Sequence, residues 1–325
     1  MISVIEAGLE TSIQDWPGRV GFYNKGFPPS GPLDSWSFRL ANILVGNEEG
    51  FAALECQFMG PTLKFDRDIV VAITGADMQA KVNGQTCPLW ESFTVYAGQS
   101  IEMSYAISGA RSYIAFCGGI AAEQTLGSRS TFAAAGVGGL TGNALKIGDI
   151  LPVEPGHGEA GRRIPLVARP HIEQQLTWEV EAVAGPNDDW IDQQGHDRFL
   201  SSEWRVSAKS NRMGMRLEGP DWTFTNKAYD KLAENGSEPA NIIDHGYPIG
   251  AVNLAGQTPI ILLNDGPSMG GFINPYTVPQ CALWKLGQAR PGETFRFKSI
   301  SVEEAQMRAR QINTLCKDCQ VNSVP

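Results

Sequence analysis

Short apolar runs, many of them alternating with polar residues, form the dominant pattern of the 325-residue chain. Alternation with a period of two is typical of strands that bury one face of a sheet. Such runs predict strands at 69–74, 92–96, 112–116 and 178–183, and the N-terminal MISVIEAGLETS predicts a first strand. The pattern therefore favours a mainly β chain.

A glycine turn followed by an alternating strand recurs at 97–103, 147–151 and 291–297. Such units belong to barrels and sandwiches rather than to folds in which strands alternate with helices. We expect a mainly β (α+β) fold with two β-rich, barrel-like domains and few short helices.

Two segments carry helix signals. Asp34 can cap a helix from Ser35 to Leu44 that stops at Gly46. The sequence Ser-Val-Glu-Glu at 301–304 has the form of a capping box and predicts a helix that continues to about Leu315.

The polar, basic stretch 154–177 contains several glycines and prolines and is interpreted as a domain boundary. We expect an N-terminal β-rich domain over 1–165 and a C-terminal β-barrel domain over 166–300. A helix and tail would follow over 301–325.

The formal net charge is −9, and there is no long Lys/Arg run, which argues against nucleic acid and anionic membranes as main partners. No apolar run approaches the roughly 20 residues of a membrane span, and the N-terminus lacks the features of a signal peptide. Of six cysteines, only Cys316 and Cys319 form a C-x-x-C pair, in a polar segment interpreted as an ordinary tail. A reducing, cytoplasmic location fits this cysteine usage.

Residues 266–270 read Gly-Pro-Ser-Met-Gly and match the G-x-S-x-G pattern of a nucleophile elbow. An elbow needs a helix after the serine, whereas the glycine, proline and β-branched residues at 270–278 disfavour one. All four histidines precede Ser268, so the usual order of that triad also fails. Two interpretations remain: a plain surface turn, or a ligand cradle in which Asp265, Ser268 and glycine N–H groups meet a small molecule.

Two other segments carry candidate chemistry, each with a structural alternative. In 27–34, Ser30, Gly31 and the following helix N-terminus can hold a carboxylate or urea-like oxygen, or the loop is only a rigid helix entry. In 209–220, Asn211 offers a donor and an acceptor and Arg212 offers a planar fork, or the segment is a polar turn with Arg212 in a structural ion pair.

No phosphate-binding P-loop, G-x-G-x-x-G, H-E-x-x-H or paired Cys/His spacing is present, so the sequence predicts neither an ATP site of the P-loop type nor a metal site. The acidic pair at 188–189 is interpreted as a solvated turn.

Several of these segments, together with others along the chain, resemble one family over about residues 2–298. It is the biotin-dependent carboxyltransferase family, also called allophanate hydrolase subunit 2, which includes the carboxyltransferase domain of urea carboxylase and the C subunit of 5-oxoprolinase. The stretches that carry the resemblance are 28–34, 39–42, 45–47, 60–63, 74–77, 126–131 and 210–214.

Within that family, residues 185–190, 265–272 and 283–288 look like the urea carboxylase version. Members often have Ser-Asp-Arg where this chain has Ser-Asn-Arg at 210–212. An aspartate suits a cationic guanidinium group, whereas an amide can pair with neutral urea. Asn211 therefore leads to the hypothesis of a neutral, urea-like substrate.

The resemblance implies cyclophilin-like barrel character and a carboxyltransferase that moves a carboxyl group from carboxybiotin to a nitrogen of urea or a related amide. Biotin would carry the chemistry, and the protein would position the groups. The residues implied as catalytic are Asn211, Arg212, Asp265 and Ser268. Those implied to bind substrate or carboxybiotin are Pro29, Ser30, Gly31, Ser128, Arg129, Gly270 and Gly271.

The chain contains no Met-Lys-Met biotinylation motif. The resemblance therefore implies that a partner carries the biotin and that ATP is used elsewhere in the complex. The partners that it implies are a companion subunit of the allophanate hydrolase subunit 1 type, a biotin carrier and a biotin carboxylase. Two alternatives stay open. One is the C subunit of 5-oxoprolinase, which is an accessory component of an ATP-dependent amide hydrolase, and the other is a non-enzymatic regulatory protein of the same fold.

Overall fold

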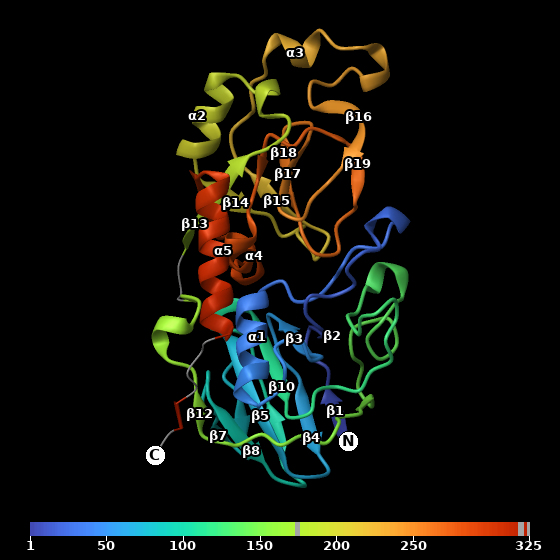
Figure 1. Ribbon diagram of the computed structural model, residues 1–325, viewed down its shortest axis with the longest axis vertical. Helices are drawn as coiled ribbons and strands as arrows, with labels where there is room; N and C mark the ends of the chain where they lie inside the picture. Colours follow the sequence, from blue (N-terminus) through green and yellow to red (C-terminus); the bar gives the residue numbers. More distant parts are fainter. Residues whose placement is uncertain (173–175, 318–321, 324–325) are drawn as a thin grey trace. The chain divides into compact units, whose positions relative to one another are not determined.

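The computed structural model describes residues 1–172, 176–317 and 322–323. The chain forms two compact units (Figure 1). The first comprises Met1–Gly21, Pro29–Gln174 and Ile312–Pro325, and the second comprises Phe22–Pro28 and Gln175–Gln311. A short N-terminal segment thus belongs to the C-terminal unit.

The first unit contains two antiparallel sheets that enclose one hydrophobic core. In sheet order, the six-stranded sheet consists of β11 (Ile150–Leu151), β1 (Ile2–Glu6), β4 (Thr62–Phe65), β9 (Ser100–Glu102), β6 (Lys81–Val82) and β7 (Gln85–Thr86). The five-stranded sheet consists of β2 (Glu10–Gln14), β3 (Ala53–Gln57), β10 (Ser108–Phe116), β5 (Ile69–Asp77) and β8 (Ser92–Val95). Each strand predicted in this part of the sequence is present.

Helix α1 (Ser35–Leu44) packs against β5 and β10 and buries a second apolar cluster that includes Phe38 and Leu44. The Asp34 side chain accepts a hydrogen bond from the Ser37 N–H at 2.9 Å, which satisfies one of the free donors of the first turn. The predicted helix and its cap are confirmed.

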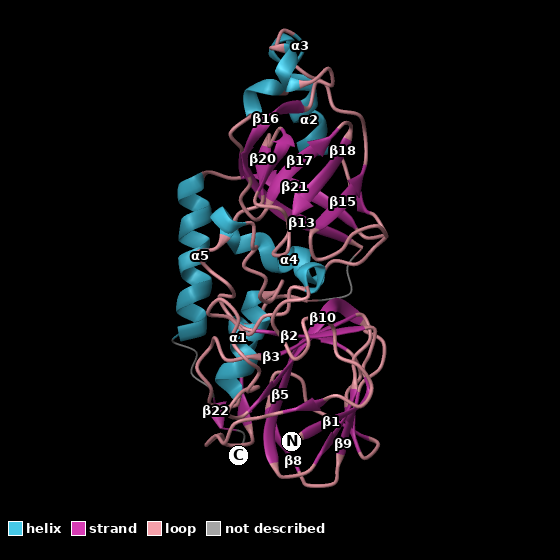
Figure 2. Cartoon of the chain, turned by 90° about the vertical axis from the view of Figure 1, so that its right-hand side faces the viewer, coloured by secondary structure: helices cyan, strands magenta, loops and turns pink. Residues whose placement is uncertain are grey.

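The second unit is built around a closed seven-stranded barrel (Figure 2). In barrel order, its strands are β13 (Thr177–Ala184), β20 (Tyr276–Thr277), β17 (Ala251–Ala255), β18 (Thr258–Leu262), β15 (Gly214–Glu218), β14 (Trp204–Val206) and β21 (Thr294–Ser299). Strands β13 and β21 are parallel, and the other neighbours are antiparallel. A barrel leaves no unpaired edge, and the mainly β fold expected from the glycine turns is confirmed.

A two-stranded ribbon of β16 (Asn241–Gly246) and β19 (Met269–Phe272) also belongs to this unit. Its helices α2 (Gln193–Ser201), α3 (Asn226–Tyr229) and α4 (Leu283–Gln288) gave no clear signal in the sequence. The remaining elements are β12 (Arg162–Arg163), β22 (Asn322–Ser323), and the 3-10 turns at Tyr23–Lys25, Ala133–Ala135, Leu166–Ala168, Asp188–Trp190, Ala233–Asn235 and Gln280–Ala282.

The C-terminal helix α5 (Val302–Lys317) begins where the capping box predicts, with the Glu304 N–H donating to Ser301 Oγ at 3.1 Å. It continues past the expected end and contains Cys316, which is buried. Cys316 is therefore part of a packed helix and not of a polar tail, whereas Cys319 lies outside the described residues. No helix within the described residues is both long enough and apolar enough to span a membrane.

Candidate functional site

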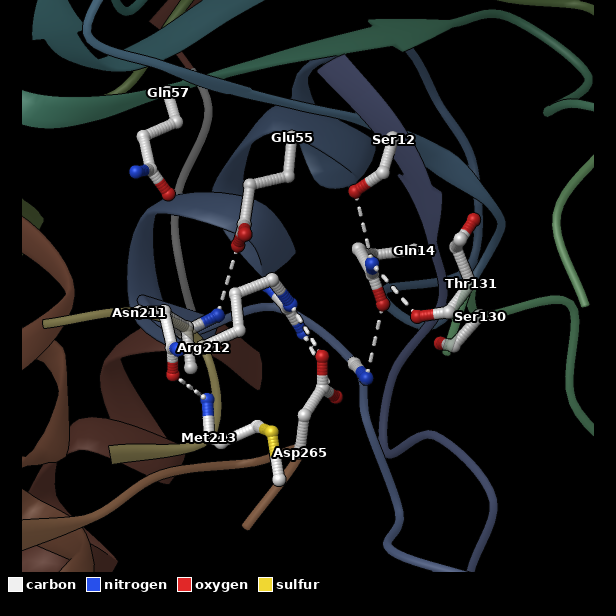
Figure 3. A network of polar contacts seen from close by, with 12 residues as sticks. Ser12, Gln14, Glu55, Gln57, Ser130, Thr131, Asn211, Arg212, Met213 and Asp265 are labelled. Carbon is white, nitrogen blue, oxygen red and sulfur yellow. Dashed lines mark hydrogen bonds and ion pairs between the residues drawn. The ribbon is translucent and has the colours of Figure 1, made fainter. Parts of the chain in front are cut away.

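The first unit brings the loop around Pro29, Ser30 and Gly31 next to the end of β2. The Gly31 N–H donates to the side-chain oxygen of Gln14 at 3.0 Å (Figure 3). Gly31 has a φ of 80°, and a Cβ there would stand 3.1 Å from the Asp15 carbonyl oxygen. The position thus requires glycine for both its conformation and its close approach to a neighbouring backbone.

Asp15 holds a second loop at the same place. Its carboxylate accepts hydrogen bonds from the Ser128 hydroxyl at 2.5 Å, the Arg129 N–H at 2.6 Å and the Ser130 hydroxyl at 2.5 Å. The guanidinium Nε of Arg129 donates to the Ala122 carbonyl at 2.9 Å. Ser128 and Arg129 are thus brought close to the Gly31 loop. The Ser128 hydroxyl, the Arg129 N–H and the Arg129 Nε are used in hydrogen bonds that hold the loops together.

Ser30 differs from its neighbours in this cluster. It is 1 % exposed, and its Oγ has no hydrogen-bond partner among the described residues. It also has a φ of 55°, a conformation that residues other than glycine adopt rarely. A buried, unpaired hydroxyl is costly unless another group completes it, so Ser30 is the candidate ligand-binding residue of this unit.

The buried carboxylate of Glu55 holds the end of the same loop. Glu55 on β3 accepts from the Leu33 N–H at 2.8 Å and the Tyr113 hydroxyl at 3.0 Å, and it forms an ion pair with Arg111 at 3.5 Å. Burial, followed by the charges of Glu55 and Asp34, raises the pKa of Tyr113 well above its usual value. The phenol therefore remains a hydrogen-bond donor, and it fixes the entry to α1.

In the second unit, Arg212 and Asp265 form a largely buried ion pair (Figure 3). Arg212 Nε lies 2.8 Å from one carboxylate oxygen, and the terminal NH2 lies 3.4 Å from the other. The two side chains are only 16 % and 7 % exposed. The Asp265 N–H also donates to the Arg212 carbonyl at 3.1 Å, so backbone and side chains join the loop before β15 to the loop after β18.

Asn211 precedes this pair and closes its own turn. Its Oδ1 accepts from the Met213 N–H at 2.9 Å and the Gly214 N–H at 3.3 Å. The side-chain oxygen is thus already used, in the manner of an Asx turn. The expectation that Asn211 offers both an acceptor and a donor is corrected: its Nδ2 group is what can address a ligand.

The loop that contains Ser268 is not a nucleophile elbow. A strand, β19, follows Ser268 where an elbow requires a helix, as expected. The Ser268 carbonyl accepts from the Tyr247 N–H at 2.8 Å, which joins the loop to the end of β16. Gly270 and Gly271 lie on β19 and line a cavity, whereas Ser268 is not among the described residues that line it.

This cavity has a volume of about 310 Å³ and lies wholly within the second unit. On β17 and β18, Val252 and Ile261 are paired and fully buried, which places them on the barrel interior. Because side chains alternate along a strand, Asn253 and its partner Ile260 lie on the opposite, outer face. The cavity is lined by this outer face, by β19 and by Tyr247, which directly follows β16.

Small and aromatic residues shape the cavity. A Cβ on Gly270 would stand 2.7 Å from the Tyr247 ring, so the ring can lie against the strand only because this residue is glycine. The Tyr247 hydroxyl accepts from the Phe272 N–H at 2.6 Å and donates to the Phe272 carbonyl at 3.2 Å. Burial raises the pKa of Tyr247, so this wall stays neutral.

The segment Phe22–Pro28 brings Tyr23 into the second unit. Burial, and then the negative charge of Asp265, raise the pKa of Tyr23 to about 12. Tyr23 therefore keeps its phenol proton, interacts electrostatically with Asp265, and is a further polar group of the site. Within the described residues, no group of three or more His, Cys, Asp and Glu side chains is arranged to hold a metal ion.

Sequence reasoning missed several residues that build these sites. Asn253 is the single polar residue of the strand AVNLA, and Glu55 is a charged residue inside the strand ALECQ; each interrupts apolar neighbours, which is a signal for a buried polar role. Asp15, Tyr23 and Tyr247 gave no such signal, because their roles depend on neighbours far away in the sequence.

Comparison with known proteins agrees with this architecture. The family model "Carboxyltransferase domain, subdomain A and B" matches residues 25–299. The chain is 38 % identical to urea amidolyase of Saccharomyces cerevisiae over 314 residues, which cover 94 % of this chain and 17 % of that protein. It is 34 % identical to the C subunit of 5-oxoprolinase from Escherichia coli over 315 residues, which cover 96 % of this chain and 94 % of that protein.

Among solved structures, the urea carboxylase of Kluyveromyces lactis matches with a TM-score of 0.94 and 34 % identity, over 100 % of this chain and 29 % of that one. The chain therefore spans only a small part of the urea amidolyase and urea carboxylase relatives, but nearly the whole of the 5-oxoprolinase relative. On this sequence and structural similarity, the chain belongs to the carboxyltransferase domain family of subdomains A and B, together with domains of urea amidolyase and urea carboxylase and with the C subunit of 5-oxoprolinase.

Proposed function

We propose that this chain is the carboxyltransferase component of a biotin-dependent carboxylase that acts on urea or a related neutral amide. The observation that carries the proposal is the group formed by Asn211, which lines the cavity of the second unit, and the adjoining Arg212–Asp265 pair. The family and the likeness to urea carboxylase support it.

The geometry suits the positioning of a neutral, nitrogen-bearing substrate. A carboxylate has about four lone-pair positions, so the ion pair with Arg212 leaves Asp265 able to accept an N–H from a substrate. The Arg212 guanidinium holds that carboxylate in one orientation. Asn211 adds a donor from Nδ2 for a substrate carbonyl. Such fixed groups lower the barrier by orientation rather than by covalent chemistry.

Carboxybiotin on a partner protein would supply the activated carboxyl group. The residues present fit such a group, because transfer places negative charge on a ureido oxygen, and the second unit offers the Asn211 amide at a cavity whose wall also includes Gly270 and Gly271. In the first unit, the unpaired Ser30 hydroxyl is a separate candidate donor. The biotin carrier, the biotin carboxylase, a companion subunit and the use of ATP are assigned to partners under this proposal.

Reconstitution with a biotin carboxylase, a biotin carrier and a companion carboxyltransferase subunit tests the function. Wild-type chain is expected to give carboxylation that depends on urea, bicarbonate and ATP. Asn211→Asp should keep the Asx turn, since a carboxylate oxygen can accept the same two N–H groups, but it replaces the Nδ2 donor with an acceptor. We expect urea turnover to fall and the preference for guanidinium to rise.

The exposed Asn143, in the first unit, provides the control: Asn143→Asp makes the same chemical change away from the proposed residues. Equal preference in wild type and Asn211→Asp would remove Asn211 from substrate selection. Absence of urea-dependent carboxylation in the complete mixture would overturn the proposed function.

A second candidate is an accessory subunit of a 5-oxoprolinase. The observation that favours it is the similarity of the chain, 34 % identical over 315 residues, to the C subunit of 5-oxoprolinase from Escherichia coli. Copurification with an oxoprolinase catalytic subunit, together with ATP-dependent hydrolysis of 5-oxoproline by the mixture, would select this candidate. A biotinylated partner in the same pull-down would select the first.

A further inference from the structure

The cavity of the second unit contains a buried amide that the proposed function has not used. Asn253 lines the cavity from β17 and is 4 % exposed. Its Oδ1 is buried without a hydrogen-bond partner, and no hydrogen bond joins its Nδ2 to a described residue. A carbonyl oxygen that is buried without a hydrogen-bond partner costs free energy, so a site of this kind calls for a ligand or a water to complete it.

The surroundings of Asn253 indicate the chemistry of that ligand. Ile260 and Leu262 on β18 provide an apolar wall on the same outer face of the barrel. Gly214 on β15 lies beside them, and a Cβ there would stand only 2.8 Å from an Ile260 methyl group. Tyr247 closes another side with its hydroxyl already bonded to the backbone. Lys209 and Arg216 also line the cavity, so it is a mainly apolar chamber that includes two basic side chains and an unpaired carboxamide on its wall.

A primary carboxamide offers one donor and one acceptor side by side. Its best small partner is a group with the same pair in reverse, an amide or ureido edge that presents C=O and N–H together. The volume of about 310 Å³ is also roughly ten times the space of one water molecule, so it accommodates more than urea alone.

We propose that Asn253 is a specificity-determining residue that binds, by two hydrogen bonds, the ureido or amide edge of a ligand whose apolar body lies against Ile260 and Leu262. This inference rests on the proposed function and deepens it. Asn211 cannot make such a paired contact, because its oxygen closes the turn with Met213 and Gly214. The same ligand chemistry has two sources: the ring system of biotin, or an alkyl-substituted urea that serves as acceptor.

Direct binding to the complete, isolated chain tests the proposal without relying on turnover. Isothermal titration with biotin methyl ester and, separately, with N-butylurea gives the two arms. Wild type is expected to bind at least one probe, and Asn253→Leu should weaken that binding by about ten- to a hundredfold, as expected for the loss of two hydrogen bonds. The probe that responds identifies the source.

Two further variants make the outcome specific. Asn253→Asp keeps the shape of the side chain but replaces a donor with a charge, so the preference for N-butylguanidinium over N-butylurea should rise at least tenfold. Asn143→Leu, at an exposed position in the first unit, should leave every affinity unchanged within twofold. Circular dichroism and thermal melting establish that each variant is folded.

The proposal is overturned if neither probe binds wild type, or if Asn253→Leu and Asn253→Asp are folded and bind as wild type does. Failure of the proposed function looks different. In that case the probes still bind and respond to Asn253, while the reconstituted mixture shows no urea-dependent carboxylation.

Discussion

The polar residues of the two units are organised in opposite ways. In the first unit, the side-chain oxygens of Asp15, Gln14 and Glu55 accept hydrogen bonds from N–H and O–H groups of nearby loops. In the second unit, Asn253 lies against a cavity with its amide unpaired. Polar groups that are hydrogen-bonded within the fold hold loops in place, whereas buried polar groups without such a bond can bond to a ligand. The comparison therefore separates residues that build a site from residues that can contact a ligand.

Each unit also contains an exception to its own pattern. Ser30 is buried and unpaired within the well-paired loops of the first unit. The Arg212–Asp265 pair is fully formed beside the open cavity of the second. Variants at these and neighbouring residues test the difference between the two units. The four predictions below run from the largest expected effect to the smallest.

Removing Asp265 should have the largest effect on stability. In Asp265→Ala, the largely buried Arg212 guanidinium would lose the carboxylate that lies 2.8 Å from its Nε, and we expect a loss of about 3–5 kcal/mol in the free energy of unfolding. Guanidinium chloride unfolding followed by tryptophan fluorescence measures this. The exposed pair of Lys298 and Glu179 in the same unit provides the control, since Glu179→Ala should cost less than about 1 kcal/mol. Similar losses in both variants would show that the Arg212–Asp265 pair is not effectively buried.

Removing Asp15 should destabilise the first unit but leave the cavity of the second intact. Asp15→Ala leaves three donors, from Ser128, Arg129 and Ser130, without their acceptor, and we expect a loss of about 2–3 kcal/mol. Binding of N-butylurea or biotin methyl ester, where wild type shows it, should stay within twofold. A tenfold loss of affinity at unchanged stability would contradict the division between loop-fixing and ligand-binding residues.

High pH should weaken the barrel through Tyr276. Burial, followed by the charges of Asp188 and Asp197, raises the pKa of Tyr276 to about 12. The fold thus favours the protonated phenol, whose ordinary pKa is about 10. Its stabilising contribution is complete below pH 10 and is lost as pH rises from 10 towards 12. Thermal melts across that interval should fall less steeply for Tyr276→Phe than for wild type. Parallel slopes would show that Tyr276 ionises at its ordinary pKa.

Removing the Ser30 hydroxyl should change stability least. Because its Oγ is buried without a partner, Ser30→Ala deletes a group that contributes no hydrogen bond, and we expect a change within about 0.5 kcal/mol. Turnover in the reconstituted system should nevertheless fall if the hydroxyl binds substrate. Chemical unfolding and initial rates provide the two measurements. A loss above about 1 kcal/mol, with normal rates, would assign Ser30 to the fold instead.

The sequence by itself determined the class of fold and the positions of most strands. The apolar, β-branched and aromatic runs at 69–74 and 112–116, and the glycine turns before β9, β11 and β21, depend on local backbone preferences that neighbouring residues fix. The cap at Asp34 is equally local, because a side chain and an N–H three residues away are sufficient to form it. The matching segments also identified the family.

Only the tertiary structure decided what each polar residue does. Asn211 and Asn253 are the same residue type, yet one oxygen closes a turn while the other lies unpaired against a cavity. The ion pair of Arg212 joins two loops 53 positions apart, and Phe22–Pro28 leaves its sequence neighbours to join the other unit. Hydrogen bonding and desolvation depend on which atoms surround a group, and those atoms come from distant parts of the chain that local preferences cannot specify.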